Sequence, residues 1–230
     1  MIKAVIFDMF ETLVTHYNSP VYMGKEIACD MGIPETKFRE IWDTSDNDRT
    51  LGKQTLEAVI EEALRVNGCY SDGLFECIIA KRKSSKRECF HHLHPEILPM
   101  LETLRKRNLK IGLITNCYYE ESDVIRASIL YPYFDSVCMS CEMGIKKPDR
   151  AIFQRSLQEL DVMPGECVYV GDGGSQELEM AQAVGMHPVQ AVWYLKEGVR
   201  QPAQRKPGFV QAQSPLEVIS KINKQDFLLL

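Results

Sequence analysis

Short apolar runs, each followed by a polar or small residue, constrain the fold of this 230-residue chain more than any other feature. The first run spans residues 2–7, and Asp8 follows it directly. Similar runs span residues 110–114, 136–139, 167–170 and 188–192. Continuous apolar runs of this length are typical of strands that are buried on both faces, as in a parallel sheet.

Helical patterns fill the intervals between the later runs. Apolar residues recur at helical spacing in residues 95–107, 149–160 and 176–184, and a final helix is predicted over 215–222. Strand and helix therefore alternate from about residue 95, which predicts an α/β fold, a Rossmann-like parallel sheet with helices on both faces. Residues 196–208 contain two prolines and are predicted to form a loop.

Residues 16–92 lack the strand pattern and are predicted to be helical. We expect a helix over 20–31, with Ser19 as its N-cap and Pro20 at its first position. Further helices are predicted over 35–43, 56–66 and 72–87. The expected domains are an α/β core, residues 1–15 and 93–230, and an all-helical cap, residues 16–92, inserted after the first strand.

Composition and charge exclude several functional classes. The net charge of −5 argues against a nucleic-acid partner. No stretch approaches the ~18 apolar residues of a membrane span, and Asp8 interrupts the N-terminal apolar run too early for a signal peptide. The eight cysteines are therefore expected to be reduced thiols in a cytoplasmic protein, without disulfides.

Polar residues follow three of the predicted strands. They are Asp8, Thr115 with Asn116, and Asp172, and Lys147 lies shortly after another strand. In an open parallel sheet, ligands bind beyond the carboxyl ends of the strands. Carboxylate and carbonyl oxygens suit Mg²⁺, which is often shared with a substrate phosphate. A divalent cation and a small anionic substrate are therefore expected at this edge.

Four motifs in this order resemble the haloacid dehalogenase superfamily of hydrolases, and they span nearly the whole chain. They are Phe-Asp-Met-Phe-Glu-Thr-Leu at 7–13, Leu-Ile-Thr-Asn at 113–116, Lys-Pro-Asp at 147–149 and Val-Gly-Asp-Gly-Gly-Ser-Gln-Glu at 170–177. The helical segment 16–92 occupies the place where many members carry a helical cap. Each motif alone is weak, whereas the ordered set is highly specific.

The resemblance implies a role for each motif. Asp8 would be the nucleophile that forms a covalent aspartyl intermediate. Thr115 and the Asn116 backbone would hold the oxygens of the transferred group, unless these residues only form the turn after the strand. Lys147 would neutralise the developing charge. Met9 and Phe10, together with Asn116 and Lys147, are the expected substrate contacts in the core.

The resemblance also implies a Mg²⁺ site. Asp8, Asp172 and the main-chain carbonyl of Phe10 would be its ligands. Glu177 lies five residues after Asp172, where relatives often have Asp. It is either a further ligand, direct or through water, or an acid favoured in the first turn of a helix.

Position 10 departs from the family pattern. Phosphatases of this family usually have a second Asp two residues after the nucleophile, as general acid and base, and this chain has Phe10 there. Dehalogenases of the family have an aromatic residue at this position but lose the metal-binding acid of the fourth motif, which this chain keeps. The adjacent Glu11 is not expected to replace the missing acid, because successive side chains of an extended segment point in opposite directions.

The cap is expected to select the substrate. Arg49, in a predicted turn at 48–53, either binds a substrate carboxylate or phosphate or is a solvated turn residue. Lys53 would be an imine-forming lysine if the chain cleaved carbon–phosphorus bonds. Phe38 and Trp42 are interpreted as cap core, and the basic run 81–87 as a solvated helix face.

These expectations favour Mg²⁺-dependent hydrolysis of a small phosphorylated metabolite through Asp8. The alternatives are a 2-haloacid dehalogenase, in which Asp8 attacks carbon, a catalytically weak metabolite-binding protein that keeps the site, and phosphonate cleavage. We expect a small-molecule anionic substrate, no nucleic acid, no membrane, and a monomer or homodimer.

Overall fold

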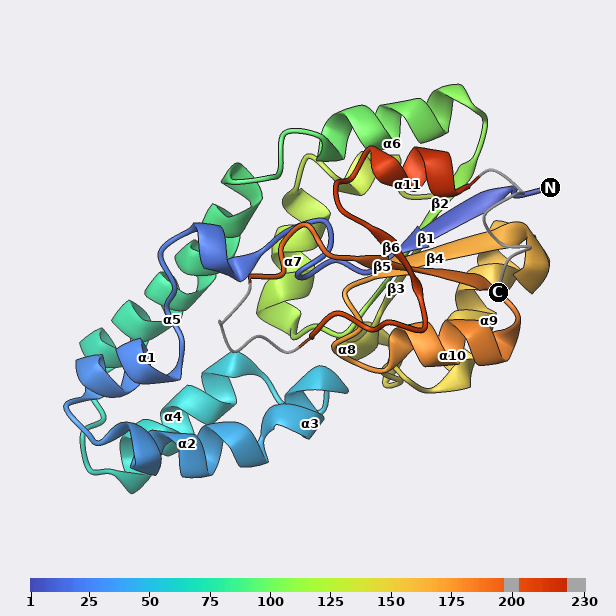
Figure 1. Ribbon diagram of the computed structural model, residues 1–230. Helices are drawn as coiled ribbons and strands as arrows, with labels where there is room; N and C mark the ends of the chain where they lie inside the picture. The colour runs from blue at the N-terminus through green and yellow to red at the C-terminus, as the bar shows by residue number, and fades with distance from the viewer. Residues whose placement is uncertain (197–202, 223–230) are drawn as a thin grey trace.

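Parallel strands form one sheet in the order β3-β2-β1-β4-β5-β6 (Figure 1). The computed structural model describes residues 1–196 and 203–222, so residues 197–202 of the predicted loop lie outside the described part. The strands are β1 Ala4–Phe7, β2 Lys110–Thr115, β3 Ser136–Met139, β4 Cys167–Gly171, β5 His187–Ala191 and β6 Val210–Ala212. The predicted Rossmann-like α/β fold is confirmed, although β6, only three residues long, was not predicted.

Helices cover both faces of the sheet. In Figure 1, α6 (Ile97–Lys106) and α11 (Glu217–Lys221) lie above it, and α9 (Arg150–Leu160) and α10 (Glu177–Val184) lie below. Side chains of β1 alternate between the two faces, as expected for a strand. Val5 and Phe7 join the core under α6, whereas Ala4 and Ile6 join the core under α9 and α10. This two-sided burial explains why the strands are continuous apolar runs.

The order of the strands places the site. β1 lies in the middle of the sheet and pairs with both β2 and β4. Phe7 is in register with Leu113 and with Val170, and the Asp8 amide donates to the Val170 carbonyl at 2.9 Å. The residues that follow β1, β2 and β4 therefore meet at one edge of the sheet, as the sequence predicts.

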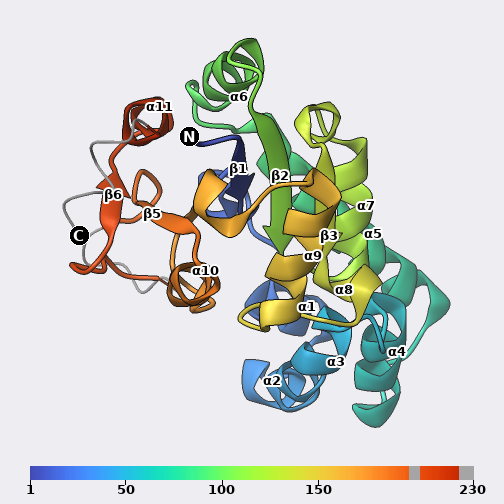
Figure 2. The same cartoon turned by 90° about the vertical axis from the view of Figure 1, so that its right-hand side faces the viewer.

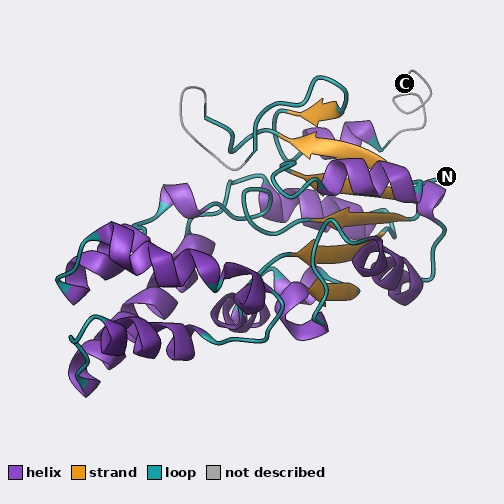
Figure 3. Ribbon diagram, turned by 90° about the horizontal axis from the view of Figure 1, so that it is seen from below, coloured by secondary structure: helices purple, strands orange, loops and turns teal. Residues whose placement is uncertain are grey.

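The helical segment lies beyond the carboxyl ends of the strands, as Figure 3 shows from a second direction. Its helices are α1 Gly24–Met31, α2 Glu35–Thr44, α3 Asp46–Thr50, α4 Leu56–Val66 and α5 Asp72–Glu88. They enclose their own apolar core, to which Ile27, Phe38, Ile60 and Leu64 contribute. Phe38 is fully buried there, and Trp42 packs against this core as predicted.

Two predictions about this segment were wrong. The helix predicted from Pro20 begins at Gly24, after Met23 rather than Ser19. Residues 20–22 bond to α5 instead, because the Tyr22 amide donates to Ser85 Oγ and Arg82 donates to the Tyr22 carbonyl. The turn predicted at 48–53 is partly helical, since α3 extends to Thr50.

Two helices after strands were not predicted. They are α7 (Tyr119–Ala127), which contacts α5, and α8 (Ser140–Met143), which contacts β3. Figure 2 shows α7 between β3 and α5. α7 begins with two buried acids, Glu120 and Glu121, so its sequence lacks the simple apolar stripe that would have predicted a helix. No helix in residues 1–196 or 203–222 is long and apolar enough to span a membrane.

Candidate active site

Asp8 and Lys147 form an ion pair at the carboxyl edge of the sheet. Lys147 Nζ lies 2.6 Å from Asp8 Oδ1, and the Met9 amide donates to the same oxygen at 2.8 Å. Both side chains are almost completely buried. Burial raises the pKa of Asp8, and Lys147 opposes this rise. The pKa of Lys147 is also raised: burial would lower it, but the negative charges of Asp8 and Glu177 outweigh burial. The geometry thus brings together the predicted nucleophile and the predicted cation.

Asn116 fixes the loop that carries Lys147. Its Oδ1 accepts from the Lys147 amide at 2.8 Å, and its Nδ2 donates to the Lys147 carbonyl at 3.1 Å. Thr115, at the end of β2, is completely buried. The Asn116 side chain therefore positions Lys147, a contact that the sequence did not predict.

Three carboxylates converge next to this pair. Oxygens of Asp8, Asp172 and Glu177 lie within 4.8 Å of one another. Glu177 is fully buried and accepts from the amides of Gly173 at 2.6 Å and Ser175 at 2.7 Å. A Cβ at position 171 would stand 2.9 Å from Glu177 Oε1, so Gly171 leaves the room that this carboxylate needs. Glu177 is therefore part of the acidic cluster and not only a first-turn acid.

Acids outnumber cations in this cluster, which we call the floor: Asp8, Lys147, Asp172 and Glu177. Burial, followed by Asp8 and Glu177, raises the pKa of Asp172 to about 8. Lys147 and backbone amides hold the pKa of Glu177 below its usual value against the effect of burial. A buried carboxylate without a partner is costly unless it takes up a proton or a cation joins it. Three convergent carboxylates are ligands of the kind that a divalent ion such as Mg²⁺ prefers.

Phe10 stands at the boundary between the sheet and the helical segment. Its ring is half-buried and stacks on the His16 ring, with 4.6 Å between the centroids. Lys86 Nζ lies 5.6 Å from the Phe10 ring centroid. The predicted position of Phe10 beside the nucleophile therefore places an aromatic ring, and no acid, next to the floor.

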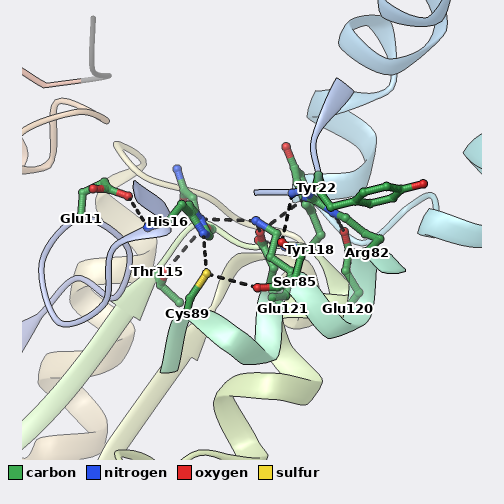
Figure 4. Close-up of polar contacts among 12 residues, drawn as sticks. Glu11, His16, Tyr22, Arg82, Ser85, Cys89, Thr115, Tyr118, Glu120 and Glu121 are labelled. Carbon is green, nitrogen blue, oxygen red and sulfur yellow. Dashed lines mark hydrogen bonds and ion pairs between the residues drawn. The ribbon is translucent and has the colours of Figure 1, made fainter. Parts of the chain in front are cut away.

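A second group of buried charges surrounds His16 and is shown in Figure 4. We call it the wall; its members are His16, Arg82, Lys86, Glu120 and Glu121. Lys86 Nζ lies 2.6 Å from Glu121 Oε1, and Arg82 Nε lies 3.5 Å from Glu120 Oε1. The prediction that residues 81–87 form a solvated helix face was wrong for Arg82 and Lys86, which are 3% and 5% exposed. These side chains lie one turn apart on α5 and face the acids of α7.

His16 is held as a neutral ring. Its Nε2 lies 3.3 Å from Lys86 Nζ and its Nδ1 lies 3.4 Å from Cys89 Sγ. An ammonium group only donates, so Nε2 accepts and Nδ1 carries the proton. Burial, followed by Lys86, lowers the pKa of His16 to about 3.

Glu11 is turned into hydrogen bonds of the chain that follows it. Its φ of 58° is in the left-handed region, and the carboxylate accepts from Thr15 Oγ1 at 2.6 Å and from the His16 amide at 3.0 Å. Burial raises its pKa, and these two hydrogen bonds oppose the rise. Both oxygens are thereby engaged as acceptors.

The helical segment places Arg49 in an unexpected environment. The predicted alternative of a solvated turn residue was wrong, because Arg49 is only 1% exposed. Its guanidinium stacks between Trp42, at 3.7 Å, and Tyr118, at 4.2 Å from the ring centroids. Lys53, by contrast, has a 64% exposed side chain near Asp48, which does not provide the desolvation that an imine-forming lysine needs.

A cavity of about 860 Å³ joins these parts. Its lining includes Asp8 and Asp172 from the floor, Arg82 and Lys86 from the wall, and also Phe10 and Trp42. Arg49 itself is not among the described residues that line it.

The sequence analysis did not predict the wall, because its ion pairs join α5 to α7, which are distant in the chain. The one feature of the sequence that could have indicated it was the four-residue spacing of Arg82 and Lys86.

Comparison with known proteins gives one consistent answer. A family model of haloacid dehalogenase-like hydrolases matches residues 2–185. Over 204 residues the chain is 27% identical to a glyceraldehyde 3-phosphate phosphatase of Methanocaldococcus jannaschii, covering 83% of this chain and 85% of that protein. It is also 31% identical over 139 residues to a phosphoserine phosphatase of Thermus thermophilus, covering 60% of this chain and 53% of that protein.

Solved structures agree with these relatives. A 2-haloacid dehalogenase from Pseudomonas syringae pv. Tomato is 26% identical, with a TM-score of 0.69 over 96% of this chain and 97% of that chain. A phosphatase from Thermococcus onnurineus, 21% identical, shares the fold, with a TM-score of 0.66 over 96% of this chain and 98% of that chain. With the ordered motifs meeting at one edge of the sheet, these matches show that the chain belongs to the haloacid dehalogenase-like hydrolases.

Proposed function

We propose that the chain is a Mg²⁺-dependent phosphatase that acts on a small phosphorylated metabolite through an aspartyl-phosphate intermediate on Asp8. The observation that carries the proposal is the floor, where three buried carboxylates converge and, among the described residues, Lys147 is the one cation that pairs with them. A dehalogenase needs the nucleophile and the lysine, whereas a metal ion would give Asp172 and Glu177 a role in phosphoryl transfer.

Each floor residue has a defined task in this reaction. An Asp8 oxygen attacks phosphorus, and the bond from phosphorus to the leaving oxygen breaks. Lys147 offsets the repulsion between Asp8 and the phosphate dianion, and Asn116 keeps the Lys147 loop in place. Water then attacks the aspartyl phosphate and releases Asp8 and inorganic phosphate.

Asp8, Asp172 and Glu177 would hold the metal ion. Mg²⁺, when bound, supplies charge neutralisation at the transferred phosphoryl group. Roles for the Phe10 carbonyl as a ligand, and for Met9, Thr115 and Arg49 as substrate contacts, stay predictions. So do the division into a core and a cap at residues 16–92, the cytoplasmic location and the monomeric or homodimeric state.

A 2-haloacid dehalogenase is the second candidate. Phe10 favours it, because a departing halide needs no proton donor, and a 2-haloacid dehalogenase is among the similar solved structures. In this reaction Asp8 would attack carbon and form an ester.

A turnover screen separates the two candidates. The purified chain is given a panel of phosphorylated metabolites and 2-chloropropionate, each with Mg²⁺ or with a chelator. The proposal predicts release of inorganic phosphate that stops in the chelator, and no release of chloride. Chloride release that is equally fast in the chelator would establish the dehalogenase instead.

A further inference from the structure

We propose that the substrate is an aryl phosphate, whose leaving oxygen departs as a phenolate without receiving a proton from the enzyme. This inference rests on the proposed phosphatase function and specifies its substrate class. It follows from the groups that surround Phe10 and from the hydrogen bonds and ion pairs in which those groups already take part.

By the family resemblance, Phe10 stands in the place of the general acid that would protonate a leaving oxygen. It lies two residues after Asp8 and its ring lines the cavity. A phenyl ring has no proton to transfer. One face of this ring is covered by His16 at 4.6 Å, so the ring is also fixed in its place.

The neighbours of Phe10 do not replace the missing donor. His16 has Nε2 facing the Lys86 ammonium and Nδ1 facing Cys89 Sγ, so both of its nitrogens are engaged within the protein. Both oxygens of Glu11 accept hydrogen bonds, from Thr15 and from the His16 amide. Among the described neighbours of the ring, His16 and Glu11 are therefore engaged within the protein, and Lys86 Nζ is held by Glu121 and His16.

Two cationic side chains of the wall line the cavity together with Phe10. Lys86 and Arg82 both line the cavity, and Lys86 Nζ lies 5.6 Å from the Phe10 ring centroid. Fixed positive groups that face developing negative charge stabilise it without reorganisation. Glu121 and Glu120 pair with these two side chains, so Lys86 and Arg82 offer a departing oxyanion hydrogen-bond donors without a net positive charge.

Leaving groups differ greatly in how much they need a proton. A phenol such as that of tyrosine has a pKa of about 10, whereas the alcohol of an alkyl ester is far less acidic. In the proposed step Asp8 forms its bond to phosphorus, and the electron pair of the breaking P–O bond leaves with the aryl oxygen. The phenolate takes its proton from water after release, and a later water molecule cleaves the aspartyl phosphate.

The lining of the cavity suits an aryl group. Phe10, Tyr17, Trp42 and Tyr118 all line the cavity of about 860 Å³. Aromatic rings prefer offset-stacked or edge-to-face partners. Arg49 already stacks on Trp42 and Tyr118, and His16 on Phe10, so an aryl leaving group has the room and can contact the edges or remaining faces of these rings.

Phenyl phosphate and cyclohexyl phosphate provide the test, since they match in size and differ mainly in the acidity of the leaving oxygen. Proton donation by a general acid is worth about 10²–10⁴-fold. We therefore expect the wild-type chain with Mg²⁺ to show a kcat/KM for phenyl phosphate at least ~10²-fold above that for cyclohexyl phosphate. Equal rates within about tenfold would overturn the inference and leave the phosphatase function intact, with a group such as the Tyr17 phenol as the donor.

Variants at position 10 sharpen the test. Phe10→Asp restores a carboxylic acid and is expected to reduce the phenyl-to-cyclohexyl ratio by at least about tenfold. Phe10→Leu is the matched control, because it removes the ring without adding an acid and is expected to keep the ratio. Rates are compared per folded molecule, with circular dichroism as the check of folding. An unchanged ratio in folded Phe10→Asp contradicts the inference.

Acetyl phosphate distinguishes an aryl from an acyl leaving group. A kcat/KM for acetyl phosphate at least ~10²-fold above that for phenyl phosphate would overturn the aryl assignment. Release of phosphate from none of these compounds, together with chloride release from 2-chloropropionate, would refute the proposed function and this inference with it.

Discussion

The floor and the wall are both groups of buried charges, and they differ in how those charges balance. The floor has three acids and one cation. The wall has two acids, two cations and a neutral histidine. A buried group of balanced charges ties elements together, whereas an unbalanced group takes up a proton or a further ion. The comparison indicates that the floor serves a ligand and the wall serves the structure.

Removing an acid from the floor is expected to have the largest effect on function and the smallest on stability. Asp172→Asn keeps the shape but removes a charge that Asp8 and Glu177 repel. Affinity for Mg²⁺ should fall by at least ~10²-fold, beyond the 10–100-fold typical of losing an outer partner of a metal ligand. Calorimetric titration with Mg²⁺ measures this change. Unaltered Mg²⁺ affinity would remove Asp172 from the metal site.

The same variant should be about as stable as the wild type in a chelator, because the Asp172 carboxyl, with its pKa raised to about 8, is mostly protonated at neutral pH and the neutral amide has a similar shape. Thermal unfolding of both proteins in EDTA measures this. A clearly lower unfolding temperature for Asp172→Asn would mean that the floor is balanced like the wall.

Removing a cation from the wall is expected to reduce stability first. Lys86→Met leaves Glu121 buried without its 2.6 Å partner, and breaking a buried pair in this way costs about 3–5 kcal/mol. Lys83→Met is the control on the same helix, since Lys83 pairs with Glu57 at the surface and such pairs contribute about 0–1 kcal/mol. Urea unfolding of the two variants gives the loss in the free energy of unfolding for each. Similar small losses in both variants would show that the ion pairs of the wall do not stabilise the fold.

The smallest effect concerns pH and His16. Because its folded-state pKa is lowered to about 3, the unfolded chain binds a proton at His16 before the folded chain does. Its contribution to stability is complete above the unfolded value of about 6.5 and is lost as pH falls toward the folded value. We expect the free energy of unfolding to fall by about 2 kcal/mol between pH 7 and pH 5.

His16→Phe, which keeps a ring against Phe10, is expected to reduce this pH dependence. Urea midpoints at the two pH values compare the variant with the wild type. An equally steep loss in the variant would assign the acid sensitivity to other groups.

The floor was largely predictable from the sequence, and the wall was not. Asp8 and Asp172 directly follow apolar strands, and the rule that ligands bind at the carboxyl ends of parallel strands brings them together. Lys86 and Glu121 lie on helices that are far apart in the chain, and no local pattern pairs them. The basic run around Lys86 resembled a solvated face because its partners on α7 come from another part of the sequence.

For the fold, too, features set by local sequence were predictable, and features set by contacts with distant residues were not. The strands that form the middle of the sheet were found from their apolar runs, since two-sided burial leaves a local signal. The start of α1 was misplaced because Tyr22 bonds to Ser85 and Arg82 of α5 instead of continuing a helix. Arg49 was expected in a turn, and only the packing of Trp42 and Tyr118 around it explains its burial.

The central claim is that Asp8 carries a phosphoryl group during turnover. Rapid acid quenching of the wild-type chain with Mg²⁺ and phenyl phosphate, followed by digestion and mass spectrometry, tests it directly. We expect a phosphoryl adduct on the peptide that contains Asp8, which disappears after treatment with hydroxylamine and is absent from Asp8→Asn. Turnover of the phosphate ester without such an adduct, or an adduct that persists in Asp8→Asn, would contradict the account.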